Sequence, residues 1–281
     1  MIQNYFKIAF RHLMKNKLFT SIKLLGLTAG VNAVLLIGLY LQNELTYDNC
    51  HEKRDRIVKV NMEYSFGGET NQANVTGNKV APVFKKDFPE VEAAVRVINL
   101  PQVVKIGGDL FEEEGIYFAD DSFFEIFTFP FIAGNLETAL DEPFRVVLTE
   151  TKAKQYFGDQ NPLGETIEIA GLEASISGIM QDPPGNTHIK PDIVVSFSSL
   201  PQSKPENETF WNANYATYFL LKNVSNIASL EAKIPDYMQQ FSEEIGSDSR
   251  LTYHLLPLEK IHLESPVPGN FEPNGGVIFI C

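Results

Sequence analysis

The chain has 281 residues, and 44% of them are hydrophobic, which is enough to bury the core of one large domain or two modest ones and excludes a disordered chain. The formal net charge is −13, but residues 1–23 carry five basic side chains and no acid, so the part after them holds 18 basic against 36 acidic residues. Because such an excess of acids repels phosphate backbones, nucleic-acid binding is excluded.

The first segment, residues 2–17, has the pattern of an amphipathic helix that lies at a membrane surface. Apolar residues recur on one face of this helix, and basic residues form a stripe on the opposite face. We assign residues 1–18 to the helix and place it on the cytoplasmic side of the membrane. The segment either lies on the lipid surface as an anchor or contacts a partner protein on the cytoplasmic side. The amphipathic pattern slightly favours the lipid-surface anchor. The apolar residues at helical spacing are Ile2, Tyr5, Phe6, Ala9, Phe10, Leu13 and Met14, and the basic ones are Lys7, Arg11 and Lys15.

Next comes an uncharged run from Leu24 to Leu41, about 27 Å of helix and close to one hydrocarbon thickness. Its flanks extend the predicted transmembrane helix to residues 19–42. A cleaved signal peptide fits less well, because its apolar region would be shorter and would end in a small-x-small site. Basic residues precede the run and Glu44 and Asp48 follow it, so we expect a cytoplasmic N-terminus, an outward domain and a bacterial inner-membrane location.

The outward domain mixes strands and helices without a regular βαβ repeat, which predicts the α+β class. We expect a hairpin at Gly107-Gly108, a helix N-cap at Asp121, a second N-cap at Asn226 and a helix stop at Gly158. Predicted strands are 56–64, 145–148, 166–169, 174–180, 193–197, 216–222 and 251–256, and predicted helices are 80–87, 121–127, 150–157 and 226–241. The proline-rich stretch 201–209 is the best candidate for a subdomain boundary.

Sequence motifs for catalysis or cofactor binding do not occur in the 281 residues. There is no GxxxxGK[ST], GxGxxG or GxSxG, and Cys50 and Cys281 alone support neither a disulfide framework nor a zinc pattern. Acids cluster at residues 112–114 and 120–121, but neighbouring acids on a loop point apart. We therefore predict no catalytic, cofactor-binding or metal-binding residue, and expect His51, His188, His254 and His262 to be surface or locally hydrogen-bonded residues.

Four blocks together resemble the MacB/FtsX-like ABC transporter permeases, in the form common in Bacteroidetes, over essentially the whole chain. The blocks are YDNCHEKRDRIVKVN, FADDSFFEIFTFPFIAGNLETALDEPFRVVLTETKAKQYFGDQNPLGETIEI, SGIMQDPPGNTHIKPDIVVSF and LLPLEKIHLES. The resemblance implies a first membrane helix followed by a periplasmic core domain, residues 43–273. That domain would consist of porter-like parts at about 43–100 and 210–273 and an inserted smaller subdomain at about 101–209.

The same resemblance implies a non-catalytic permease subunit that works as a dimer, depends on a separate cytoplasmic ABC ATPase and often on a periplasmic adaptor protein. ATP would be bound by the ATPase, with no cofactor in this chain, and the periplasmic domain would serve export or envelope mechanotransmission. Phe129, Phe157, Gly158 and Gly164 would have structural roles. Since such permeases have further membrane helices, we expect residues 274–281 to begin a second, truncated span.

The competing reading is a single-pass membrane-anchored sensor or scaffold whose outward domain binds a ligand. It is disfavoured because only about 20 residues lie on the cytoplasmic side, too few for an output module. A membrane-anchored hydrolase comes third because no site supports it. The transported substrate does not follow from any feature of the sequence.

Overall fold

The computed structural model describes residues 2–246 and 249–265, and the expected second span at 274–281 lies outside them. The chain divides into two compact units, residues 1–46 and 47–281, which are described separately below.

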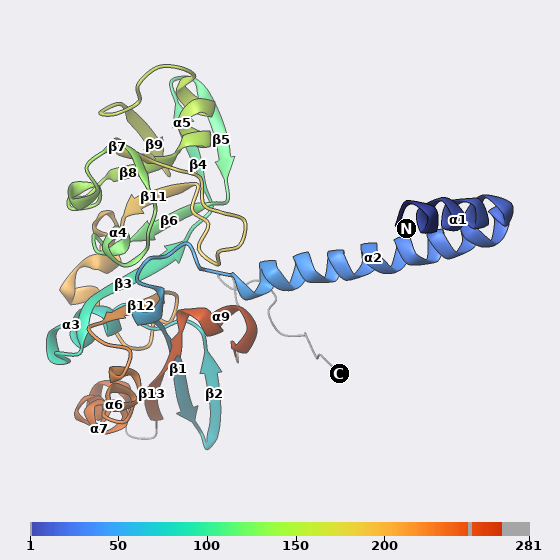
Figure 1. The fold of residues 1–281 in the computed structure, drawn as a ribbon. Helices are drawn as coiled ribbons and strands as arrows, with labels where there is room; N and C mark the ends of the chain where they lie inside the picture. The colour runs from blue at the N-terminus through green and yellow to red at the C-terminus, as the bar shows by residue number, and fades with distance from the viewer. Residues whose placement is uncertain (1, 247–248, 266–281) are drawn as a thin grey trace. The chain divides into compact units, whose positions relative to one another are not determined.

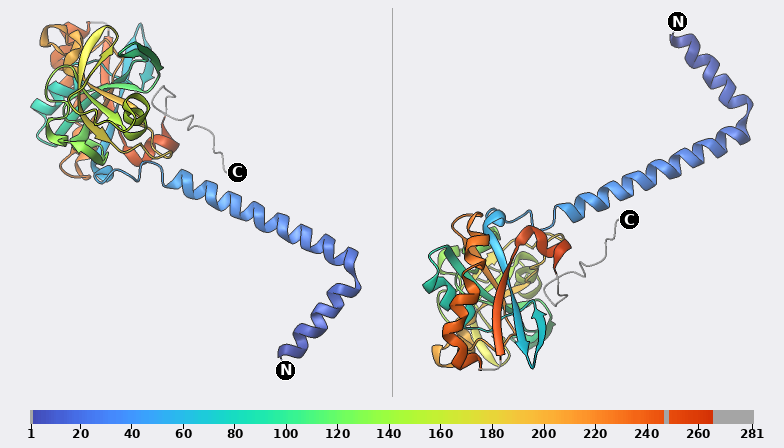
Figure 2. Two further views of the ribbon diagram at one scale, coloured as in Figure 1. Left: turned by 90° about the horizontal axis from the view of Figure 1, so that it is seen from above. Right: turned by 90° about the horizontal axis from the view of Figure 1, so that it is seen from below.

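The first unit consists of two helices, α1 (Ile2–Lys15) and α2 (Lys17–Leu45), which meet at Asn16 (Figure 2). Thr20 Oγ1 donates a hydrogen bond to the Leu13 carbonyl, 3.0 Å away, and so ties the two helices together at the bend. No residue of α2 is buried. Within the described residues, α2 is the one helix long and apolar enough to cross a membrane, and it extends beyond the predicted span at both ends.

In the second unit, as far as the structure describes it, thirteen strands form one mixed sheet in the order β13-β1-β12-β3-β6-β11-β8-β10-β9-β4-β5, with β2 on β1 and β7 on β10 (Figure 1). Pairing is antiparallel except for β10 with β8 and β11 with β6. The strands are β1 (Ile57–Phe66), β2 (Glu69–Ala73), β3 (Val91–Asn99), β4 (Gln102–Ile106), β5 (Asp109–Glu113), β6 (Ile116–Ala119), β7 (Phe131–Gly134), β8 (Arg145–Thr149), β9 (Thr166–Ile169), β10 (Leu172–Met180), β11 (Ile193–Ser196), β12 (Ala216–Leu221) and β13 (Ser249–Pro257).

Short helices cover the sheet, and together with it they confirm the α+β class. The α-helices are α3 (Val80–Asp87), α4 (Phe123–Ile126), α5 (Glu150–Phe157), α6 (Asn226–Glu231), α7 (Ile234–Met238), α8 (Ser242–Ile245) and α9 (Leu258–Glu264). The 3₁₀ turns are η1 (Arg54–Arg56), η2 (Leu136–Thr138), η3 (Phe197–Ser199), η4 (Pro201–Ser203), η5 (Pro205–Asn207) and η6 (Gln239–Phe241).

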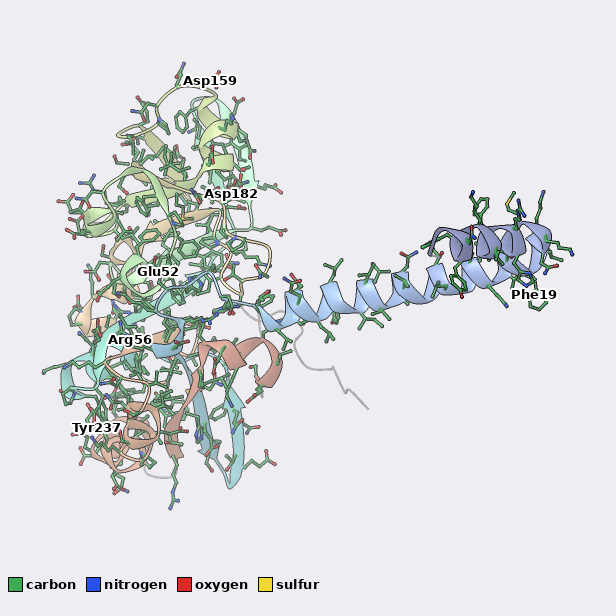
Figure 3. The ribbon with its side chains drawn as sticks, in the orientation of Figure 1. Phe19, Glu52, Arg56, Asp159, Asp182 and Tyr237 are labelled. Carbon is green, nitrogen blue, oxygen red and sulfur yellow. The ribbon has the colours of Figure 1, made fainter. Side chains whose placement is uncertain are left out.

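Three apolar clusters form the core. One lies where α3 and α6–α8 meet the β13-β1-β12 end of the sheet; there Phe84 packs against Phe219 and Tyr253, and Tyr237 of α7, labelled in Figure 3, closes over it. A second is built on the aromatic residues of and after α4. The third fills the β8-β10-β9-β4 end beneath α5. The inner strands β6, β11 and β12 are buried along their whole length and contribute side chains to these clusters.

Two predicted helix starts are wrong. The N-cap of α4 is Ser122, not Asp121, because the Ser122 carbonyl accepts the first hydrogen bond of the helix, from the Ile126 amide at 3.0 Å. The N-cap of α6 is Ser225, not Asn226. The single helix predicted for 226–241 is also wrong: the chain breaks between α6 and α7, since Pro235 lacks an amide hydrogen and fits only the first turn of a helix.

Other local predictions are confirmed. The Gly107-Gly108 hairpin joins β4 to β5, with Ile106 opposite Asp109. Gly158 ends α5 at a φ of +63°, a conformation that disfavours residues with a Cβ. Phe129 is buried in the core. The division into porter-like parts and an inserted subdomain stays a prediction.

Candidate functional site

The residues directly after α2 enter a buried polar cluster, which we call the juxtamembrane cluster and define as Asp48, His51, Thr187, His188 and Tyr218. Asp48 is the third residue after the end of α2, and its side chain is almost fully buried at 1% exposure. Its φ is +57°, a left-handed conformation that aspartate and asparagine tolerate better than most residues. The backbone turn therefore directs this carboxyl into the protein rather than to its surface.

The carboxyl of Asp48 is held by the loop that precedes β11. Its Oδ1 accepts hydrogen bonds from Thr187 Oγ1 at 2.7 Å and from the His188 amide at 2.9 Å, and His188 Nδ1 lies 2.9 Å away. The Asp48 amide in turn donates to the Asn186 carbonyl at 2.9 Å. Its other oxygen, Oδ2, is buried and has no hydrogen-bond partner among the described residues. The segment that directly follows α2 in sequence is thus attached to a loop some 140 residues further along the chain.

His188 carries the connection into the sheet. Its Nε2 lies 3.0 Å from the hydroxyl of Tyr218, a fully buried residue of the inner strand β12. Asp48, His188 and Tyr218 therefore form a continuous series of contacts from the segment that follows α2 to the inner strand β12. Buried polar groups that satisfy one another in this way fix a single arrangement of the segments that carry them.

His51 secures the same segment on its other side. Its Nδ1 accepts a hydrogen bond from the Thr128 amide at 3.1 Å, so in the neutral ring the proton sits on Nε2, which faces Thr187 Oγ1 at 3.4 Å. The ring packs edge-on against Phe127 and Phe129, with centroids 5.1 and 5.7 Å away. The aromatic cluster around α4 is the surface on which the segment rests.

Neighbouring residues extend these attachments. Tyr47 stacks on His262 of α9, with centroids 3.8 Å apart and planes 3° from parallel. The Glu52 amide donates to Thr128 Oγ1 at 3.0 Å, and Lys53 Nζ donates to the Glu125 carbonyl at 2.8 Å. Arg56, labelled with Glu52 in Figure 3, pairs with Glu92 of β3 at 2.5 Å. The stretch from Tyr47 to Arg56 is therefore anchored at intervals of no more than three residues.

Burial and neighbouring polar groups determine the protonation states of Asp48 and His51. Burial alone would raise the pKa of the Asp48 carboxyl, but the charge of His188 and the hydrogen bonds from His188 and Thr187 outweigh it and hold that pKa below its ordinary value. Burial, with a contribution from the charge of His188, lowers the pKa of His51 from 6.5 to about 4. At neutral pH Asp48 is ionised and His51 is uncharged.

We expect acidification to destabilise the domain through His51. The unfolded chain takes up a proton on this ring near pH 6.5, whereas the folded chain resists protonation down to about pH 4. The unfolded state therefore binds more protons in that window, and the free energy of unfolding falls as the pH falls, by up to about 3 kcal/mol at pH 4. Urea unfolding of the wild type and of His51→Gln, followed from pH 7 to 4.5, measures the effect, and equal slopes for the two proteins would contradict it.

The other candidates from the sequence are surface ion pairs or structural contacts. His254 is half-exposed between Glu231 and Glu63, at 2.9 and 3.2 Å. Of the acids at 112–114, Glu113 is buried, where it pairs with Lys152 and accepts a hydrogen bond from the Tyr156 hydroxyl at 2.5 Å. No group of three or more potential metal ligands occurs in the described part of the chain.

The sequence did not predict the juxtamembrane cluster. Both of its histidines were expected to be local or exposed, but their partners are distant in sequence and they are buried. The sequence offers two weak signals. A Tyr-Asp-x-x-His run lies close to the end of an apolar helix, and an Asn-Thr-His run lies in a turn-rich stretch elsewhere. Nothing in the spacing of either run indicates that the two meet.

Comparisons with known proteins agree with this architecture. The model of the MacB-like periplasmic core domain family matches residues 20–237. A crystal structure of a domain assigned to a permease protein from Porphyromonas gingivalis superposes with a TM-score of 0.65 and 23% identity, covering 77% of this chain and 95% of that one. Among curated protein sequences, no relative matches at a significant level.

Two further solved structures have lower similarity. The periplasmic region of MacB from Actinobacillus actinomycetemcomitans gives a TM-score of 0.47 at 14% identity, covering 68% of this chain and 87% of that one. The extracellular domain of the noncanonical ABC-type transporter YknZ from Gram-positive bacteria gives 0.47 at 10% identity, covering 70% and 99%. On the match of the family model to most of its length, this chain belongs to the family of proteins with a MacB-like periplasmic core domain.

Proposed function

We propose that this chain is a permease subunit that couples ATP hydrolysis in the cytoplasm to movement of its periplasmic domain, for export or for mechanotransmission across the envelope. Family membership supports the permease assignment, and one feature of the geometry supports the coupling. Only Thr46 and Tyr47 separate the end of α2 from Asp48, whose carboxyl is buried in the juxtamembrane cluster.

A link of this kind transmits displacement well. A long flexible linker would absorb a movement of the membrane helix through its own conformational freedom. Here the chain passes from helix to buried hydrogen bonds within two residues, and Asp48, His188 and Tyr218 lead on to an inner strand of the sheet. A displacement of the helix end would therefore act on the sheet itself.

The partners follow from what the chain lacks as well as from its family. The 281 residues contain no Walker-type phosphate loop, so ATP is bound by a separate cytoplasmic ABC ATPase. We infer a second permease protomer and a periplasmic adaptor protein as further partners. The exposed apolar face of α1, which carries Tyr5, Phe6 and Phe10, is suited to lie on the lipid surface of the inner membrane.

The proposed orientation predicts that Cys50 faces the periplasm. In spheroplasts that carry the Cys281→Ser variant, a membrane-impermeant maleimide is expected to label Cys50 without permeabilisation. Since burial raises the pKa of this thiol, labelling will be slower than for a free cysteine, and the rate in the unfolded chain provides the reference. Labelling that requires a permeabilised membrane would reverse the orientation.

The proposed coupling predicts that the purified chain has no ATPase activity of its own and that it binds an ATPase encoded in the same cell. Affinity purification from mild detergent, followed by mass spectrometry and an ATP hydrolysis assay, measures both. We expect a Walker-motif ATPase in the eluate. On a further column, ATP hydrolysis should elute with this ATPase and not with the permease. ATP hydrolysis by the chain alone would refute the proposal, and a stable complex with only a periplasmic protein would favour the sensor or scaffold reading.

A further inference from the structure

The basic stripe of α1 is a charged surface that the proposed function does not yet use. It consists of Lys7, Arg11 and Lys15, which recur every fourth residue, so their side chains leave one face of the helix at intervals of about 6 Å. All three side chains are exposed, and residues 1–23 contain no acid that could neutralise them. The stripe is therefore a strip of positive charge about 12 Å long.

The stripe faces away from the apolar side of the same helix. At about 100° per residue, it lies roughly 150° around the helix axis from the mean direction of the large apolar side chains. These side chains, all of them exposed, are Tyr5, Phe6, Phe10 and Leu13. When this apolar side enters the lipid surface, the stripe points into the cytoplasm, whereas cations that bind lipid headgroups lie best at the borders of an apolar face.

One apolar residue lies beside the stripe instead of with the other apolar residues. Ile8 is about 20° from Lys15 and about 60° from Arg11 around the helix axis. It is 66% exposed, and in the orientation described above lipid does not cover it. Ile8, Arg11 and Lys15 stand at i, i+3 and i+7, the spacing by which a helix presents one face to a groove of another protein. An apolar anchor surrounded by cations is suited to a protein partner.

A protein that holds the stripe also holds α2. Only Asn16 separates the two helices, and Thr20 Oγ1 of α2 donates a hydrogen bond to the Leu13 carbonyl of α1 at 3.0 Å (Figure 2). A short, hydrogen-bonded bend passes on a displacement that a long flexible linker would absorb. Movement of a partner on the stripe would therefore reach the start of α2.

We propose that the face of α1 formed by Lys7, Ile8, Arg11 and Lys15 docks into an acidic groove of the cytoplasmic ATPase. Ile8 fills an apolar pocket in the floor of the groove, and the three cations face carboxylates on its rim. This inference rests on the proposed function, since it takes the ATPase as the partner and the N-terminus as cytoplasmic. It adds to that function the surface through which the ATPase acts on α2.

Site-specific photocross-linking identifies what covers each side of α1. In the full chain, expressed in its native cells, p-benzoylphenylalanine replaces Ile8 or, as the matched control on the apolar side, Phe10. Irradiation is expected to join position 8 to a protein that mass spectrometry identifies as a Walker-motif ATPase, and position 10 to lipid. At position 8, an adduct with lipid or nucleic acid, an adduct with a protein that lacks a Walker motif, or no adduct would each overturn the inference.

Charge variants test the stripe itself. Arg11→Gln/Lys15→Gln is expected to weaken binding of the purified ATPase to the full chain in detergent micelles about tenfold, because two cations no longer face carboxylates. Lys17→Gln/Lys23→Gln removes the same charge from α2 and should change the dissociation constant by less than about twofold. Labelling of Cys50 from outside verifies the orientation of both variants in the membrane.

The outcomes separate this inference from the proposed function. An ATPase that binds the wild type and Arg11→Gln/Lys15→Gln with equal affinity would leave the proposed function intact and refute the docking surface. Equal weakening by the two double variants would attribute binding to net charge instead of the stripe, and would refute it as well. If the wild type binds no ATPase, the proposed function and this inference both fail.

Discussion

Replacing Arg96 with methionine is expected to lower the free energy of unfolding by about 3 kcal/mol, because it leaves two partly buried carboxylates without their cation. Arg96 is a residue of β3 that is 8% exposed. Its guanidinium pairs with Asp120 at 2.8 Å and with Glu208 at 3.4 Å, and it donates a hydrogen bond to the Asn78 carbonyl at 2.9 Å. Methionine keeps much of the apolar stem but none of these contacts.

An exposed arginine–glutamate pair serves as the control that isolates the effect of burial. Arg145 pairs with Glu142 at 2.5 Å, but both side chains are substantially exposed, so Arg145→Met should cost less than about 1 kcal/mol. Urea unfolding of the full chain in detergent, followed by Trp211 fluorescence, measures both. We further expect the double variant Arg96→Met/Asp120→Leu to regain part of the loss, since it removes one of the stranded charges. Similar losses for Arg96→Met and Arg145→Met would contradict the assignment.

Arg96 also explains how the proline-rich stretch 201–209 is held. Glu208, its ion-pair partner, lies in that stretch, and Asn78 Nδ2 donates to the carbonyls of Gln202 and Asn207, at 2.7 and 3.1 Å. The sequence suggested a subdomain boundary here on composition alone. In the folded protein, side-chain hydrogen bonds and an ion pair hold this stretch against the domain. Its proline and polar residues form the short 3₁₀ turns η4 and η5.

Local periodicity predicted the elements whose residues are buried on one face. In β1 the alternating Val58, Val60 and Met62 lie together in one apolar cluster, as the pattern predicts, although Lys59 and Asn61 between them are buried as well. β2 was missed because its Glu-Thr-Asn-Gln sequence is almost wholly exposed and contains no apolar alternation; it is a strand only because β1 offers it hydrogen bonds beyond a two-glycine turn. Between α6 and α7 the apolar pattern alone predicts one continuous helix, whereas Pro235 indicates the break.

The candidate site could not be predicted for a different reason. The pairing of Asp48 with His188 depends on where the sheet order places the loop before β11, and that order has several crossovers between strands distant in sequence. No spacing rule connects residues 140 positions apart. Both segments lie in blocks that resemble the permease family, but only the fold shows that they are in contact.

The contact itself can be measured by replacing Asp48. Asp48→Leu is expected to destabilise the domain by about 3–5 kcal/mol, because it strands the polar groups of Thr187 and His188 in the interior and puts a branched side chain at a φ of +57°. Asp48→Asn tolerates that backbone and keeps an acceptor at Oδ1, so it should lose only about 1–3 kcal/mol. Asp55→Asn, an exposed acid seven residues on, is the control for loss of charge alone.

A double-mutant cycle with His188→Leu then separates the pair from its surroundings. If Asp48 and His188 stabilise one another, the double variant Asp48→Leu/His188→Leu should be more stable than the sum of the two single losses implies, by about 1–3 kcal/mol. Each single variant leaves one member of the buried pair without the other, whereas the double variant removes both, so the second substitution is less costly than it would be alone. Free energies of unfolding from urea titration at pH 7 give all four corners of the cycle. Strict additivity would mean that the two side chains are buried near one another without interacting, and it would remove the polar connection through which we propose that movement of the membrane helix reaches the sheet.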